Sequence, residues 1–204
     1  QSEDIFGRNH PTRFGNAIEI YGGCENFVVS NCYIYQVYDA AITHQHQGDT
    51  DETLVMKNVL YTNNLIEDCV YSIEYFLGRK DTNQSHYMEN ILVANNLMRR
   101  AGYGWGKQRP DKETPAHIKS WCHHINRATN FRVENNIFDR STHDLLNIAA
   151  AQKEWLPTLS ENTYIQHRDK MAGAWGSEGL RYVYDDTVTQ SLKEVFGETK
   201  GEIL

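Results

Sequence analysis

The sequence has few cysteines and no long apolar run. Its four cysteines, Cys24, Cys32, Cys69 and Cys122, are widely spaced, which argues against a zinc knuckle and against a dense disulfide scaffold. We expect buried free thiols, because cysteine is among the residue types most often fully buried. No apolar stretch approaches the ~20 residues that a membrane-spanning helix needs, so no membrane span is expected.

An excess of positive charge is also lacking. The chain has 20 lysines and arginines against 27 aspartates and glutamates, which gives a net charge of -7. A nucleic-acid partner is not expected, because such proteins usually carry a clustered basic face. The negative field also disfavours a strongly acidic polysaccharide, so a neutral or weakly charged glycan fits more easily. With 40% hydrophobic and 23% charged residues, the 204-residue chain can form one sizeable folded domain.

What the sequence does contain is an internal repeat. Five pentapeptides carry an isoleucine in second place: AIEIY at 17–21, AITHQ at 41–45, SIEYF at 72–76, HIKSW at 117–121 and NIAAA at 147–151. A second motif follows in step and has an asparagine in fifth place, at Asn31, Asn63, Asn95, Asn135 and Asn162. Apolar residues alternate with period two inside both motifs, which indicates strands. Units repeating every ~20–50 residues are typical of stacked architectures, so we predict a β-solenoid.

On these motifs, residues 15–166 resemble the right-handed parallel β-helices of the pectate lyase type. The resemblance implies an all-β fold, a single-stranded right-handed parallel β-helix of about five coils, with three short strands per coil and a stacked asparagine ladder at one corner. It also implies a carbohydrate-active, extracytoplasmic or secreted protein. The family includes lyases, hydrolases, epimerases and non-catalytic adhesins, so the resemblance indicates the fold rather than the reaction.

We predict two segments, a β-helix at 1–166 and a C-terminal tail at 167–204. In the tail, Val188, Leu192, Val195 and Phe196 share one face of a helix expected at 187–196, with Gly197 just past its end. This helix is expected to cap the last coil and to cover its open sheet edge. Because the first full coil begins within about fifteen residues, we also expect a missing N-terminal segment, since terminal repeats normally need a cap.

If the isoleucines point inward, the residues beside them point to solvent. One outward column is predicted to be Glu19, Thr43, Glu74, Lys119 and Ala149. The backbones of Glu19 and Glu74 would lie roughly 9 to 10 Å apart, near the ~6.5–9.5 Å used by inverting glycosidases. Lys119 would favour an ionised Glu74 as the base, leaving Glu19 as the acid. The alternative is an ordinary Glu74–Lys119 ion pair beside a solvated Glu19.

Two further outward columns give the substrate-binding candidates. One reads Ala17, Ala41, Ser72, His117 and Asn147, and the other contains the aromatic residues Tyr21, Phe76 and Trp121. Flat rings suit the C–H faces of sugars, although the loops could instead bury all three rings. His117, Thr43, the aromatic rings and Arg109 in the long 99–115 insertion are the expected substrate contacts, with the inserted loops as groove walls.

No metal site is predicted. His44 and His46 would share a strand face near Asp49 and Asp51, but His44 falls in the inward column, which favours a core histidine. Oxygen ligands are thinly scattered, so a bound calcium ion is left open rather than predicted.

The preferred function is hydrolysis of a polysaccharide or oligosaccharide bound along the groove. A polysaccharide lyase is the nearest alternative, with Lys119 as the base and Arg79, Arg99 or Arg109 neutralising a uronate carboxylate. The third hypothesis is a non-catalytic glycan-binding or adhesion β-helix.

Overall fold

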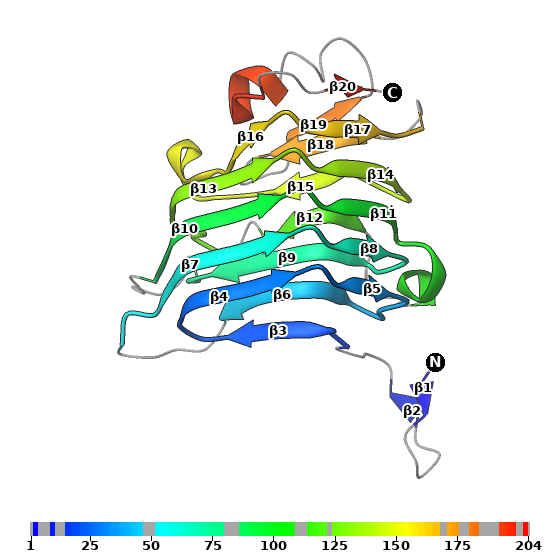
Figure 1. Cartoon of the computed structure of the whole chain (residues 1–204), viewed down its shortest axis with the longest axis horizontal. Helices are drawn as coiled ribbons and strands as arrows, with labels where there is room; N and C mark the ends of the chain where they lie inside the picture. The colour runs from blue at the N-terminus through cyan, green and yellow to red at the C-terminus, as the bar shows by residue number, and fades with distance from the viewer. Residues whose placement is uncertain are drawn as a thin grey trace.

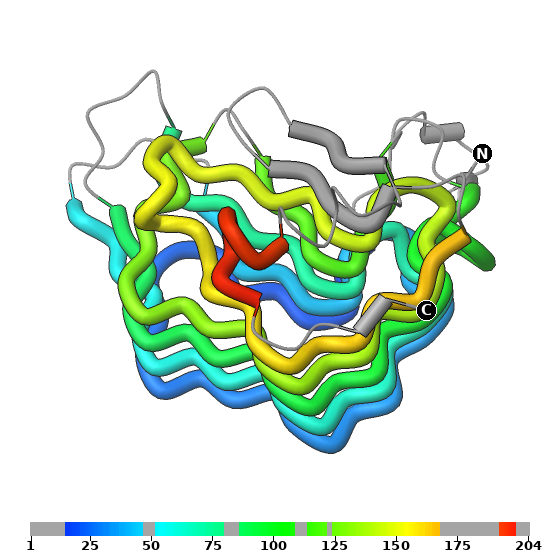
Figure 2. The backbone as a smooth tube through the Cα atoms, turned by 90° about the horizontal axis from the view of Figure 1, so that it is seen from above, coloured from blue at the N-terminus to red at the C-terminus, as the bar shows by residue number. Residues whose placement is uncertain are grey.

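The computed structural model describes residues 2–3, 9–10, 15–46, 52–79, 86–108, 114–121, 124–167, 171–175, 180–183, 192–198 and 202–203. These residues form a parallel β-helix, as predicted. Its coils rise as a right-handed spiral from β3 at one end to the C-terminal helix at the other (Figures 1 and 2).

Three sheets run along the solenoid, and each of the five coils contributes one strand to each, while the last strands of sheets 2 and 3 lie beyond the fifth coil. Sheet 1 contains β4 (Cys24–Ser30), β7 (Val55–Thr62), β10 (Tyr87–Ala94), β13 (Ala128–Glu134) and β16 (Thr158–Ser160). Sheet 2 contains β5 (Tyr33–Tyr35), β8 (Leu65–Glu67), β11 (Leu97–Ala101), β14 (Ile137–Ser141), β17 (Thr163–Ile165) and β20 (Glu202–Ile203). Sheet 3 contains β3 (Ile18–Tyr21), β6 (Ala40–His46), β9 (Tyr71–Leu77), β12 (Ala116–Ser120), β15 (Leu146–Ile148), β18 (Met171–Trp175) and β19 (Leu180–Val183). The described residues therefore form the five predicted coils.

The remaining elements are short. β1 (Ser2–Glu3) and β2 (Asn9–His10) pair antiparallel. The 3-10 helix η1 (Gly104–Gln108) lies in the insertion between β11 and β12, and η2 (Lys153–Trp155) lies between β15 and β16. No helix among the described residues is long and apolar enough to cross a membrane. Cys24, Cys32 and Cys69 are free thiols, as expected, but only Cys69 is buried and the other two are partly exposed. Cys122 lies outside the described residues.

Each coil bends where single residues adopt a left-handed backbone conformation. In the first coil these are Asn26, Asn31 and Gln36, with φ of 59°, 56° and 55°. The next three coils repeat them at Asn58, Asn63 and Asp68, at Asn90, Asn95 and Arg100, and at Asn130, Asn135 and Arg140. Asparagine tolerates this conformation better than most residues, because its short polar side chain can hydrogen-bond locally. The corners therefore stack, and their alignment sets the register of the coils.

The core lies between the three sheets and contains the predicted isoleucine column. Ile18, Ile42, Ile73 and Ile118 are in register, and the last three are fully buried. The fifth member was predicted wrongly, because Leu146 and not Ile148 pairs with Ile118. Ile148 is two residues further along the same strand and is also buried.

A buried asparagine ladder joins the coils between sheets 1 and 2. Asn96 Oδ1 accepts from the backbone N–H and the Nδ2 of Asn64, at 3.0 Å each, and Asn96 Nδ2 donates to Asn136 Oδ1 at 2.9 Å. Asn136 in turn donates to Asn162. The predicted ladder was therefore one residue out of place in its first four members. Asn31, Asn63, Asn95 and Asn135 form the left-handed corner. The residue that follows is a ladder asparagine in the last three of these copies, whereas in the first it is Cys32, whose backbone N–H donates to Asn64 Oδ1 at 3.0 Å.

The C-terminal helix closes the last coil. It spans residues 192–196, and Leu192 and Phe196 pack into the core. Gly197, with φ of 71°, ends the helix and donates its N–H to Lys193 O at 3.0 Å. Glu198 then accepts from Asn162 Nδ2 at 3.0 Å and from the Tyr164 hydroxyl at 2.7 Å, which terminates the ladder. The capping helix is confirmed, while its expected start at 187–191 lies outside the described residues.

Candidate functional site

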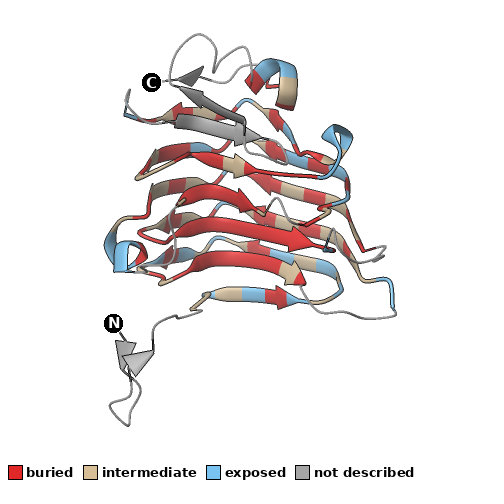
Figure 3. Cartoon of the chain, turned by 180° about the vertical axis from the view of Figure 1, so that it is seen from behind, coloured by how far each residue is buried: buried red, intermediate tan, exposed pale blue. Residues whose placement is uncertain are grey.

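The outer face of sheet 3 carries the column of residues singled out by the sequence. The strand register aligns Glu19, Thr43, Glu74 and Lys119, as the repeat predicts. The next position is Asn147 rather than Ala149, since Lys119 pairs with Asn147. Most of this face is buried, because β9 and β12 are buried along their whole length and Figure 3 shows them so. A charged column under such cover needs internal partners.

Glu74 and Lys119 find partners on β15 and on the residues that flank β12. Trp121 Nε1 donates to Glu74 Oε1 at 2.7 Å. The Lys119 ammonium donates to Asn147 Oδ1 at 2.9 Å and to Thr114 Oγ1 at 3.2 Å, and it lies 4.3 Å from the centre of the Trp121 ring. The indole therefore holds the carboxylate with its N–H and the ammonium with its π face, which fixes both charges in place.

The polar chain continues into the turn before β15. Asn147 Nδ2 donates to Asp144 Oδ2 at 2.8 Å, and Asp144 is fully buried. His143 Nδ1 lies 3.1 Å from Asp144 Oδ1. Sequence reasoning missed Asp144 and His143, because both lie in a turn where strand alternation says nothing about direction. Only their adjacency to the repeat could have pointed to them.

Glu19 lies at the accessible end of the column. Its carboxylate is exposed and accepts from Gln45 Nε2 at 2.7 Å and from Asn16 Nδ2 at 2.9 Å. Two strand spacings separate it from Glu74, which puts the two backbones roughly 9 to 10 Å apart. Thr43 lies between them, and its buried hydroxyl has no hydrogen-bond partner among the described residues.

The three aromatic candidates do not form one exposed row. Tyr21 is exposed and its ring lies 5.2 Å from that of His46. Phe76 is buried, with its ring 4.7 Å from that of His124. Trp121 is half-buried and contacts Glu74 and Lys119. Tyr21 is therefore the member of this row that remains open to a ligand.

His117 was predicted to lie on the outer face, and this prediction was wrong. It is fully buried, its ring lies 6.0 Å from that of Phe138 in the core, and its Nδ1 lies 3.0 Å from Ser72 Oγ. Burial lowers the pKa of His117 to about 4. The alternation breaks at this step, where the register of β9 with both neighbours omits Ser72. Two consecutive residues of each strand therefore point inward, His117 with Ile118 on β12 and Ser72 with Ile73 on β9.

The other candidates are distributed elsewhere. Arg109 lies outside the described residues. Arg99, an alternative for neutralising a uronate, is on sheet 2, where it contacts Glu67 and Asp139, so it does not join the column. His44 is a core residue, as expected. Its Nδ1 lies 3.0 Å from the Tyr61 hydroxyl, and burial lowers its pKa to about 3. The part of the chain that the structure describes contains no group of three or more metal-ligating side chains.

Comparisons with protein-family models, with curated proteins and with solved structures found no match. The fold and the site define a parallel β-helix with a buried carboxylate and lysine, joined by a half-buried indole, on the outer face of one sheet.

Proposed function

We propose that this chain is a carbohydrate-active β-helix of the pectate lyase type, and that it hydrolyses glycosidic bonds of a glycan bound beside Glu19, at the accessible end of the outer face of sheet 3. The observation that carries the proposal is the register column in which Glu19 and Glu74 lie two strands apart. Two carboxyl groups flanking one bond, with room for a water molecule, are what inverting hydrolysis requires.

The partners of Glu74 suggest that it is the base, and Glu19, as the other carboxyl group of the column, is then assigned as the acid. Glu74 accepts from the Trp121 indole and neighbours Lys119 in the register, and both favour the ionised form that a base needs. It would take a proton from the water that attacks the anomeric carbon. Glu19, at the accessible end, would give its proton to the leaving glycosidic oxygen, so that the bond breaks with inversion.

Glu19→Gln and Glu74→Gln test the proposal, with Glu25→Gln as a matched control because Glu25 is an exposed glutamate on sheet 1. The assay is release of reducing ends from a panel of neutral and weakly charged glycans. Each of the two site variants should lose about 10²–10⁴-fold in turnover, and the control should keep wild-type turnover. Wild-type turnover in both site variants, or no product from the wild-type chain, would remove the hydrolase proposal.

The second candidate function is a polysaccharide lyase, and one observation favours it. Lys119 is buried, and its two neutral acceptors, Thr114 Oγ1 and Asn147 Oδ1, hold its Nζ in one position, from which the deprotonated amine would take the proton of a uronate. A lyase product contains an unsaturated uronate that absorbs in the ultraviolet, whereas a hydrolase product does not. Glycan binding without either product would favour a binding or adhesion module.

A further inference from the structure

The outer face of sheet 2 carries two rows of side chains that run along the solenoid. The strand register gives the first row as Tyr33, Leu65, Leu97 and Ile137, and the second as Tyr35, Glu67, Arg99 and Asp139. Tyr33 and Tyr35 are each 55% exposed, and their rings stack with centroids 4.6 Å apart. An exposed aromatic pair at the end of an apolar row is typical of a binding surface.

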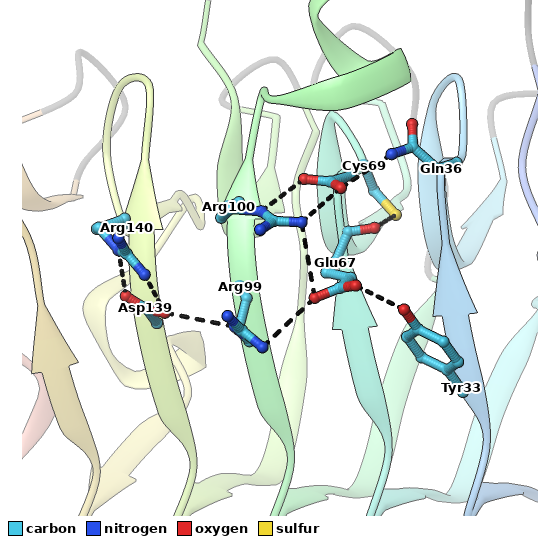
Figure 4. Close-up of polar contacts among 9 residues, drawn as sticks. Tyr33, Gln36, Glu67, Cys69, Arg99, Arg100, Asp139 and Arg140 are labelled. Carbon is cyan, nitrogen blue, oxygen red and sulfur yellow. Dashed lines mark hydrogen bonds and ion pairs between the residues drawn. The ribbon is translucent and has the colours of Figure 1, made fainter.

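The second row is a continuous polar network (Figure 4). The Tyr33 hydroxyl donates to Glu67 Oε1 at 2.6 Å, and Arg99 lies 3.6 Å from Glu67 and 3.5 Å from Asp139. Arg140 donates to both oxygens of Asp139, at 2.6 and 2.9 Å. Because each group is oriented by a neighbour, the surface presents fixed donors and acceptors beside the apolar row.

A third column at the corner after sheet 2 completes the surface. Arg100 donates to both oxygens of Asp68, at 2.8 and 2.7 Å, and Gln36 Nε2 donates to the same carboxylate at 2.9 Å. Gln36 Oε1 accepts from the backbone N–H of Trp105 in η1 at 2.9 Å. This bond ties the 54% exposed Trp105 to the edge of the surface.

The charges of this surface balance. Three carboxylates, on Glu67, Asp68 and Asp139, contact three guanidinium groups, on Arg99, Arg100 and Arg140. A charged ligand would have to break one of these pairs, whereas an uncharged ligand can lie over them. Sugars combine apolar C–H faces with many hydroxyl groups, so they match an apolar row beside fixed polar groups. Strands ~4.8 Å apart are spaced about as closely as the rings of a glycan chain.

We propose that the outer face of sheet 2 binds a neutral glycan chain, with Tyr33 and Tyr35 as its aromatic platform and the Glu67–Arg99–Asp139 row as its hydrogen-bonding partner. The choice of a glycan rests on the proposed function, but the surface lies on a different sheet from Glu19 and Glu74. It serves as an accessory site that holds the polymer while the bond is cleaved elsewhere.

The test is binding of neutral glucans, xylans and mannans by isothermal titration calorimetry, with co-sedimentation for the insoluble polymers. A Tyr33→Ala, Tyr35→Ala double variant should bind about tenfold more weakly, because each lost aromatic contact contributes appreciably. Tyr33→Phe keeps the ring and should retain most of the affinity. Val28→Ala is the matched control, since Val28 is 56% exposed in the same coil but on sheet 1.

The outcomes separate this proposal from the proposed hydrolase. Binding that depends on the two tyrosines, without hydrolysis, would support the glycan-binding surface and refute the hydrolase proposal. If both proposals hold, the double variant should still hydrolyse short oligosaccharides at the wild-type rate. The surface proposal is overturned if no neutral glycan in the panel binds, or if Val28→Ala weakens binding as much. It is also overturned if light scattering shows a dimer that the double variant abolishes, because the face would then pair with a second copy.

Discussion

The asparagine ladder should be the most sensitive polar element of the fold, and Asn96→Ala tests it. Asn96 makes four side-chain hydrogen bonds: two from Asn64, at 3.0 Å each, one to Tyr61 O at 3.0 Å and one to Asn136 Oδ1 at 2.9 Å. Alanine removes all four and leaves buried donors and acceptors unpaired. At about 1 kcal/mol for each buried bond, the free energy of unfolding should fall by about 3–5 kcal/mol.

Asn95 provides a matched control one residue earlier. It is exposed and has a φ of 57°, so Asn95→Ala should cost only about 1 kcal/mol of left-handed strain, and Asn95→Gly should cost almost nothing. Urea unfolding followed by circular dichroism measures all three variants. The reasoning is refuted if Asn96→Ala costs less than Asn95→Ala, because the ladder would then contribute less than the corner that precedes it.

Two further predictions concern packing and pH. A Cβ on Gly106 would lie 2.6 Å from the backbone of Cys69, whereas one on Gly22, with φ of 95°, meets nothing within 4 Å. Gly106→Ala should therefore cost about 1–3 kcal/mol by overpacking and Gly22→Ala about 1 kcal/mol by strain; a lower urea midpoint for Gly22→Ala than for Gly106→Ala would contradict this. The pKa values of His44 and His117 are lowered by burial to about 3 and about 4, so the unfolded chain takes up their protons first as pH falls. Stability should drop below pH ~6.5, by about 2 kcal/mol per histidine at pH 5, and thermal unfolding of His44→Phe should show a smaller loss than wild type.

The sequence repeat predicts the inside of the molecule well because stacking constrains it. The alternation correctly placed Ile42, Ile73 and Ile118 in one column, since a register slip of one residue would turn them all outward. A shift of two residues keeps every side chain on the same face. This is why the pattern could not choose between Leu146 and Ile148.

The misplaced ladder has a similar cause. Three copies of the motif contain two consecutive asparagines, the first at the left-handed corner and the second in the ladder. In the last copy Glu161 occupies the corner, with φ of 58°, so the one asparagine left, Asn162, belongs to the ladder. Aligning it with Asn31 and with the first asparagine of each pair misplaced the first four members of the ladder by one residue.

The site was harder to predict than the coils. The register of Glu19, Thr43 and Glu74 follows from the repeat, but the burial of Glu74 and Lys119 does not, because it depends on segments distant in the sequence. The inward turn of His117 depends on a local break in alternation that its residue type does not signal. Asp144 lies in a turn outside both motifs and could not be oriented.

These outcomes follow from how a solenoid divides its residues. Inward and corner positions contact the same positions one coil away, so similar residues recur there and leave a repeat that can be recognised. Outward positions contact ligands, loops or solvent and need not resemble their neighbours, as the sequence of Glu19, Thr43, Glu74, Lys119 and Asn147 illustrates. A ligand-binding position on an outer face is therefore one at which the repeat does not predict the residue type. An outward column is best interpreted by asking which of its members the structure fixes with partners, as it does for Glu74 on sheet 3 and for Glu67 on sheet 2.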